Sequence, residues 1–140
     1  MNDVIVEFEN IINIFPKQIS EINNNRFTLK LENKWSENEI LGHLIDSAII
    51  NYLRIIKAQF EDNPQLFYNQ NNYVKYANYN NSDIVQLINL WVSLNTQILF
   101  LFQQVVDKKV IDRNCNNVSL EFLIVDYVKH LKHHINQILL

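Results

Sequence analysis

Residues 33–54, NKWSENEILGHLIDSAIINYLR, contain a helix start followed by a helix that is apolar on most of its sides. Ser36 and Glu39 have the S-x-x-E spacing of a capping box, in which each side chain bonds the backbone of the other residue. The apolar residues that follow cover most of the helix circumference, so we expect this helix to be largely buried. It should continue through Phe60 and stop before Pro64, because the residue before a proline avoids helical geometry.

Three further segments have helical periodicity. A stripe of apolar residues runs over residues 4–22, where Pro16 is expected to kink the helix or split it in two. Another stripe begins after Ser82, and the last begins after Ser119, which suits the N-cap position. Four helices of this length are typical of a four-helix bundle.

The composition supports an all-α fold in one domain, residues 1–140. The chain is 48% hydrophobic and only 19% charged, so it is expected to fold into a globular domain. It has a single glycine and two prolines, which leaves little of the turn chemistry that β-hairpins use. We therefore predict a four-helix bundle with few connections.

Charge and cysteine content exclude several classes of partner. The net charge of -3 provides no basic surface for a phosphate backbone, so we expect no nucleic-acid partner. No continuous apolar run approaches the ~18–20 residues of a membrane span, so no membrane partner is expected either. Cys115 is the only cysteine, and the first ten residues, MNDVIVEFEN, lack the basic start of a secretory signal. A cytoplasmic location follows as an expectation.

The connection over residues 61–81 is unusually long for a compact domain. It is rich in aromatic side chains, namely Phe67, Tyr68, Tyr73, Tyr76 and Tyr79. Long loops without secondary structure are uncommon and often form lids or binding loops. The aromatic residues could equally cover one end of the bundle core, and the two interpretations are compatible.

Three of the four histidines lie in HLKHH, residues 130–134. On a helical wheel of about 100° per residue, His134 falls inside the apolar arc of the last helix and His130 lies at its edge. His133 falls on the polar side and is predicted to lie on the surface. Residues at i and i+4 lie one above the other on a helix, so His130 and His134 could share one metal ion.

The fourth histidine, His43, lies on a narrow polar stripe of the second predicted helix. The other members of the stripe are Glu39, Asp46, Ser47, Asn51, Arg54 and Lys57. The stripe could face solvent as an ordinary polar surface, or it could face an internal cleft. Two inward-facing imidazoles on the last helix favour the cleft, because buried imidazoles need polar partners.

The blocks GHLIDS, residues 42–47, and HLKHH, residues 130–134, resemble the DinB superfamily of bacterial four-helix proteins. The closest group is that of the YfiT-like metal-dependent hydrolases, which includes bacillithiol S-transferases. The likeness extends over nearly the whole chain. It implies a bundle whose first three helices run up, down and up. The metal ligands of the family match His43, His130 and His134.

The resemblance and the histidine pattern together predict a divalent metal ion held by these three imidazoles. Zinc and nickel are the expected metals. The expected function is metal-dependent hydrolysis or thiol S-transfer on a small-molecule substrate, which could be a low-molecular-weight thiol. Asp46 is expected to accept a proton from an imidazole N–H. Asn51 and Arg54 are expected to line the substrate side.

Two further expectations complete the sequence-based interpretation. The alternative to an enzyme is a non-catalytic binding or stress-response module with the DinB fold. The resemblance also implies a homodimer, and Trp35 and Trp91 are candidates for the surface that would join two copies.

Overall fold

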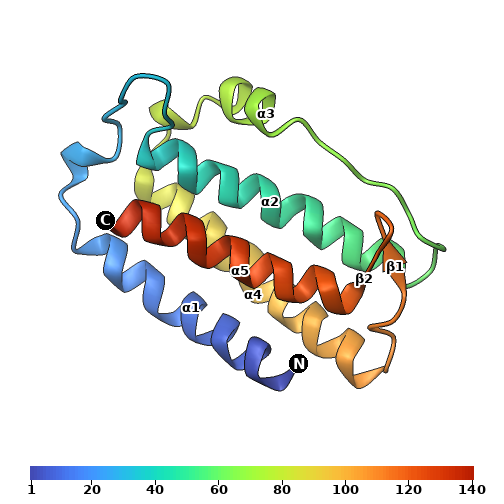
Figure 1. Ribbon diagram of the computed structural model, residues 1–140. Coiled ribbons are helices and arrows are strands. Elements are labelled where there is room, and N and C mark those ends of the chain that lie inside the picture. The colour runs from blue at the N-terminus through green and yellow to red at the C-terminus, as the bar shows by residue number, and fades with distance from the viewer.

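The computed structural model of the protein describes residues 1–140, apart from the side chain of Asn24. The all-α prediction is confirmed, because four long helices form a bundle (Figure 1): α1 Asn2–Ser20, α2 Glu37–Ala58, α4 Ile84–Asp107 and α5 Leu120–Leu139. The shorter elements are η1 Asn24–Arg26, α3 Gln70–Ala77, η2 Tyr79–Asn81, β1 Asn114–Cys115 and β2 Val118–Ser119. Both α4 and α5 pack against α1 and α2.

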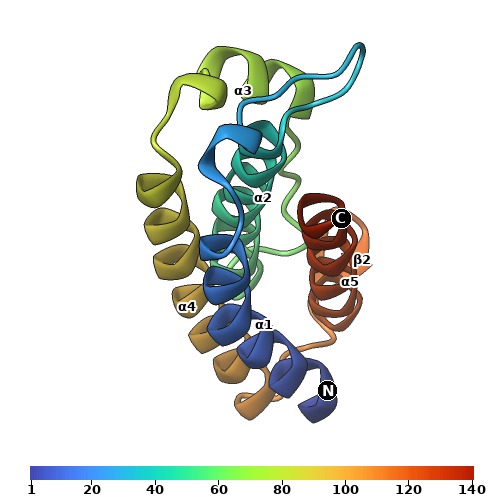
Figure 2. The ribbon, with the colours of Figure 1, turned by 90° about the vertical axis from the view of Figure 1, so that its left-hand side faces the viewer.

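The helices of the bundle run up, down, down and up, so the expected up-down-up order of the first three is wrong. At the start of α2, Asn38 Nδ2 donates to the carbonyl of Ser82, just before α4, at 3.1 Å. At the other end, Gln104 of α4 donates to Gln59 Oε1, just after α2, at 3.1 Å. The two helices are therefore parallel. The segment 59–83 carries the chain back along the bundle, with α3 packed on the outer side of α2 (Figure 2).

The predicted starts of α2 and α5 are confirmed. Ser36 Oγ accepts from Glu39 N at 3.1 Å and Ser36 N donates to Glu39 Oε1 at 2.9 Å, which completes the capping box. Ser119 caps α5 by accepting from Phe122 N at 3.1 Å. α1 continues through Pro16 to Ser20, so the proline does not split the helix in two.

Asparagine takes the place of glycine at the turns of this chain. Residues with positive φ are Asn33, Asn63, Asn78, Lys109, Asn116 and Asn117. Asparagine tolerates this left-handed region better than most residues. Asn116 and Asn117 are the two central residues of the β1–β2 hairpin, where a type I′ turn requires positive φ. The scarcity of glycine therefore did not exclude a hairpin, which the sequence analysis had not expected.

The aromatic residues of the 61–81 connection have different environments. Tyr79 is buried against the bundle with 9% exposure, whereas Tyr73 and Tyr76 are 51% and 77% exposed. Tyr68 is half-buried, and its ring packs against Tyr73 at 5.1 Å. Only Tyr79 of these four joins the core, and α3 and η2 give the connection the secondary structure that the sequence analysis did not anticipate.

Trp91 is fully buried in the core, at 0% exposure, and its ring packs against Phe15 at 5.1 Å. It cannot contribute to a surface between two copies of the chain. Trp35 is partly exposed, so the homodimer remains a prediction that rests on the resemblance and on Trp35.

By length and composition, α4 is apolar enough to cross a membrane. Core helices of water-soluble bundles meet the same two criteria. One face of α4 packs into the core of this bundle through Trp91, Ile98 and Phe102, all at 0% exposure.

Candidate metal centre

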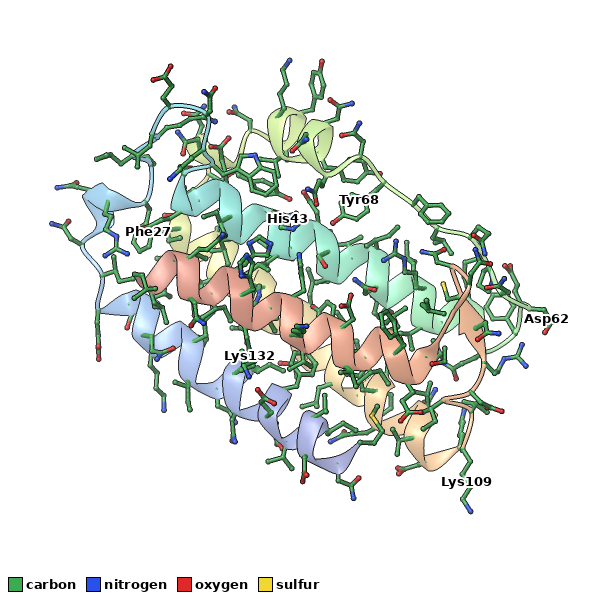
Figure 3. All side chains as sticks on the ribbon, viewed as in Figure 1. Phe27, His43, Asp62, Tyr68, Lys109 and Lys132 are labelled. Carbon is green, nitrogen blue, oxygen red and sulfur yellow. The ribbon has the colours of Figure 1, made fainter. Side chains whose placement is uncertain are left out.

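Three imidazoles converge between α2 and α5. His43 projects from α2 toward α5 (Figure 3), where His130 and His134 occupy successive turns. The Nε2 atoms of His43 and His130 stand 3.2 Å apart, and one ring nitrogen from each of the three residues lies within 4.8 Å of the other two. The structure thus brings together the three histidines that the helical wheel and the resemblance selected.

His133 lies outside this cluster. It is exposed on the surface of α5, as the helical wheel predicts. Its Nε2 stands 3.4 Å from the amide nitrogen of Gln137, and the same amide group reaches His134 through its oxygen.

The three clustered imidazoles are neutral at physiological pH. Burial, with smaller contributions from the neighbouring His130 and His134, lowers the pKa of His43 to about 4. Burial likewise lowers the pKa of His130 to about 4, with His134 next in effect. Burial lowers the pKa of His134, and its hydrogen bond to Gln137 opposes that decrease. A neutral imidazole has a lone pair, which is the form that binds metals.

The hydrogen bond of His134 determines which of its nitrogens is free. His134 Nδ1 stands 2.8 Å from Gln137 Oε1, and an amide oxygen only accepts, so Nδ1 carries the proton. The lone pair of His134 is then on Nε2, the nitrogen left to bind a metal ion. A carbonyl or carboxylate partner on the second nitrogen is typical of histidines that bind metals.

These donors fit a divalent ion. Two nitrogens bound to one zinc ion at about 2.0–2.1 Å lie roughly 3–4 Å apart, and the His43–His130 separation of 3.2 Å is within that span. Imidazole nitrogen suits zinc, nickel, copper and iron. Nδ1 of His43 is buried without a hydrogen-bond partner among the described residues. This ring therefore has one orphaned nitrogen and one nitrogen facing the cluster.

Most of the polar stripe of α2 is buried and only Arg54 and Lys57, toward its end, are partly exposed, so its interpretation as an ordinary solvent-facing surface is wrong. Glu39, His43, Asp46, Ser47 and Asn51 are between 2% and 8% exposed. Their hydrogen-bond partners come from distant parts of the chain or from an adjacent turn of α2. Buried polar side chains keep such partners because an unpaired polar group inside a protein is costly.

Asp46 is paired with Tyr79. Its Oδ1 accepts from the Tyr79 hydroxyl at 2.5 Å, and its Oδ2 is buried without a partner among the described residues. Burial raises the pKa of Asp46, and the bond from Tyr79 opposes that rise. No hydrogen bond of the described residues joins Asp46 to an imidazole, so the role expected for it remains a prediction.

Asn51 and Arg54 share a cleft with two of the imidazoles. The cleft has a volume of about 230 Å³, and His43, His130, Asn51, Arg54 and Tyr68 are among its lining residues. His134 also lines a second hollow of about 510 Å³, whose lining is mixed and includes Trp35, Lys34 and Glu37. The histidine cluster therefore borders two hollows, one lined by His43 and His130 and the other by His134.

Three residues beside the cluster were missed in the sequence analysis. Gln137 lies three positions after His134, and this helical spacing could have identified it. Tyr68 and Tyr79 were noted as loop aromatics only. Their positions depend on how the 59–83 crossover packs on α2, for which the local sequence contains no signal.

Comparison of the sequence with protein-family profiles and with curated proteins gives no match. Comparison with solved structures gives YfiT from Bacillus subtilis, described as a probable metal-dependent hydrolase with an unusual four-helix bundle topology. The TM-score is 0.87 at 19% sequence identity, and the match covers 98% of this chain and 82% of that one. At this identity the likeness establishes the fold. The chain has the four-helix bundle fold of YfiT, the fold that the blocks GHLIDS and HLKHH pointed to.

Proposed function

We propose that the protein is a metal-dependent hydrolase acting on a small molecule. The observation that supports this most strongly is the convergence of three neutral imidazoles beside a polar cleft. The structural neighbour's description as a probable metal-dependent hydrolase agrees with this proposal.

In the proposed site, His43, His130 and His134 hold a divalent ion, with zinc and nickel as the first candidates. An ion held there by three neutral ligands would supply Lewis-acid chemistry toward water or a substrate oxygen. Burial keeps the imidazoles neutral, so they remain available as ligands. Gln137 fixes the orientation and the tautomer of His134.

Residues of the cleft position the substrate in this proposal. Asn51 and Arg54 lie on the same wall of the cleft as His43, because all three project from one side of α2. Tyr68 forms part of the opposite side, and burial, followed by the charge of Asp46, raises the pKa of its hydroxyl. Tyr68 therefore remains a neutral hydrogen-bond donor at physiological pH.

Two other functions are compatible with the same residues. A thiol as nucleophile in place of water would make the protein a thiol S-transferase. A non-catalytic binding or stress-response module would hold the ion without turnover. The transferase and the binding module require the same three ligands as the hydrolase, so only a measurement of activity distinguishes the three functions.

The test combines metal content with turnover. The full chain, purified from growth without added metal, is analysed for bound elements and then reloaded with zinc or nickel. It is assayed on ester and amide substrates, with and without cysteine as the thiol. Hydrolysis that disappears in His130→Ala and persists in His133→Ala supports the proposal. Turnover only with cysteine indicates the transferase, and metal binding without any turnover indicates the module.

A further inference from the structure

Arg54 is a half-buried cation without a counter-ion. The ion pairs of the described residues involve other positive side chains, namely Arg26, Lys30, Lys57, Arg113 and Lys132. Asp126 lies at the exposed rim of the same cleft, and no ion pair joins it to Arg54 among the described residues. A partly buried charge without a partner is unfavourable for folding, and functional sites are where such arrangements persist.

The hydrogen bonds of Arg54 leave part of its guanidinium free. Nε and Nη2 donate to the carbonyl of Leu66 at 3.0 and 2.6 Å, and Nη1 donates to Asn51 Oδ1 at 3.3 Å. A guanidinium has five N–H groups. If each bond uses one of them, two remain without a partner among the described residues, one on each terminal nitrogen. Such a pair matches the two oxygens of a carboxylate.

The surroundings hold the guanidinium in place. Asn116 bonds both backbone groups of Leu66, accepting from its N–H at 2.8 Å and donating to its carbonyl at 2.9 Å. Asn51 is itself fixed, since its amide donates to the carbonyl of Ser47 at 2.8 Å. The partners of Arg54 are therefore set before any ligand arrives, which lowers the entropy that binding would otherwise cost.

Arg54 and the imidazoles lie at different places along one cleft. Arg54 is eleven positions after His43 on α2, a spacing of about 16 Å between backbone positions on the same side of the helix. Both side chains line the same hollow. A ligand that reaches both would be elongated, with a charged group at one end and the reacting group at the other.

We propose that Arg54 binds a carboxylate of the substrate, so that the substrate is a small organic acid whose reacting group lies at the histidine cluster. This deepens the proposed function and rests on it for the position of the reacting group. Arg54 is the one positively charged side chain among the described residues that line the cleft. Its two remaining N–H groups, one on each terminal nitrogen, suit the paired oxygens of one carboxylate group.

Titration calorimetry of the full chain tests this assignment. Glutarate serves as the probe, and glutaramide serves as a probe of the same shape without charge. We expect the metal-free wild-type protein to bind glutarate at least tenfold more tightly than glutaramide. Arg54→Gln should remove that preference. The matched control is Arg113→Gln, because Arg113 also bonds backbone carbonyls but pairs with Asp62 instead of lining the cleft. It should keep the preference.

Several results would overturn the carboxylate site. These are equal binding of the two probes by the wild type, an unchanged preference in Arg54→Gln, or tighter binding of inorganic phosphate than of glutarate. If Arg54→Gln fails to fold, the comparison of glutarate with glutaramide in the wild type and in Arg54→Lys still tests the site. Lysine keeps the positive charge but loses the two-pronged geometry of the guanidinium. Zinc is titrated into the same samples. A protein that prefers glutarate but binds no zinc contradicts the proposed function and leaves the Arg54 site intact.

Discussion

The ring of Tyr79 lies directly over Gly42, so closely that a β-carbon on Gly42 would stand 2.0 Å from Tyr79 Cδ2. Gly42 is the only glycine of the chain and immediately precedes His43. The hydroxyl of the same tyrosine donates to Asp46, one turn further along α2. This contact therefore fixes the crossover segment to the part of α2 that carries the first candidate metal ligand.

Gly42→Ala should destabilise the protein. An alanine in the middle of a helix normally stabilises it by about 0.5–1 kcal/mol relative to glycine. Here the added methyl group would overlap the Tyr79 ring, and overpacking of this kind costs about 1–3 kcal/mol. Urea unfolding followed by circular dichroism would measure the free energy of unfolding, and a decrease is expected.

The control for this prediction is the same substitution in a Tyr79→Ala background. Without the ring the overlap disappears, so Gly42→Ala should then be neutral or stabilising. If the two substitutions prove additive, the Tyr79 ring is not the cause of the destabilisation.

The sequence predicted those parts of the fold that depend on neighbours along the chain. The capping box of Ser36 and Glu39 and the N-cap Ser119 are local, and both were predicted correctly. The helical wheel also separated His133 from the inward pair His130 and His134, because helical periodicity alone fixes their directions.

The missed features depend on contacts between distant residues. The parallel arrangement of α2 and α4 depends on how the 59–83 crossover lies against α2, with contacts such as that between Asn38 and Ser82. The pairing of Asp46 with Tyr79 spans 33 positions. The burial of the α2 stripe could not be decided from periodicity, since a polar stripe looks the same whether it faces solvent or a cleft.

Single substitutions should separate the metal ligands from their neighbours. His43→Ala, His130→Ala and His134→Ala should each weaken zinc or nickel binding by more than the roughly 10–100-fold typical of losing an outer-shell partner. Gln137→Ala should fall within that range, because it only orients His134. His133→Ala should bind like the wild type and change stability by less than about 0.5 kcal/mol.

Calorimetric titration and elemental analysis of the five variants would check this order. A site emptied by His133→Ala but not by His130→Ala would show that the two residues have been assigned the wrong roles. Equal metal content in all five variants would contradict the proposal that three histidines bind the metal ion.

The metal-free protein should lose stability as the pH falls below about 6.5. His43 and His130 have a pKa of about 4 in the folded protein, whereas an unfolded histidine has a pKa of about 6.5. Between these values the unfolded chain binds protons that the folded chain does not, so the free energy of unfolding rises with pH in this window. The raised pKa of Asp46 acts in the opposite direction.

Comparison of variants isolates the histidine contribution, because the effect of Asp46 is common to all of them. Thermal and urea unfolding at pH 7.5, 6 and 5 should show a shallower decrease for His43→Ala than for the wild type. His133→Ala, exposed on the surface, should retain the wild-type slope. Identical slopes for the wild type and His43→Ala would mean that the imidazole of His43 titrates normally in the folded protein.

Two asparagines with positive φ should respond differently to replacement by glycine. Glycine adopts this backbone conformation without steric cost, so the backbone itself does not oppose either change. Asn33 is exposed and has no side-chain hydrogen bond among the described residues, so Asn33→Gly should change stability by less than about 0.5 kcal/mol. Asn116→Gly removes both bonds to Leu66, and we expect a loss of about 1–3 kcal/mol. Urea unfolding of the two variants measures the difference, and equal stabilities would show that the Asn116 amide does not hold the segment on which Arg54 depends.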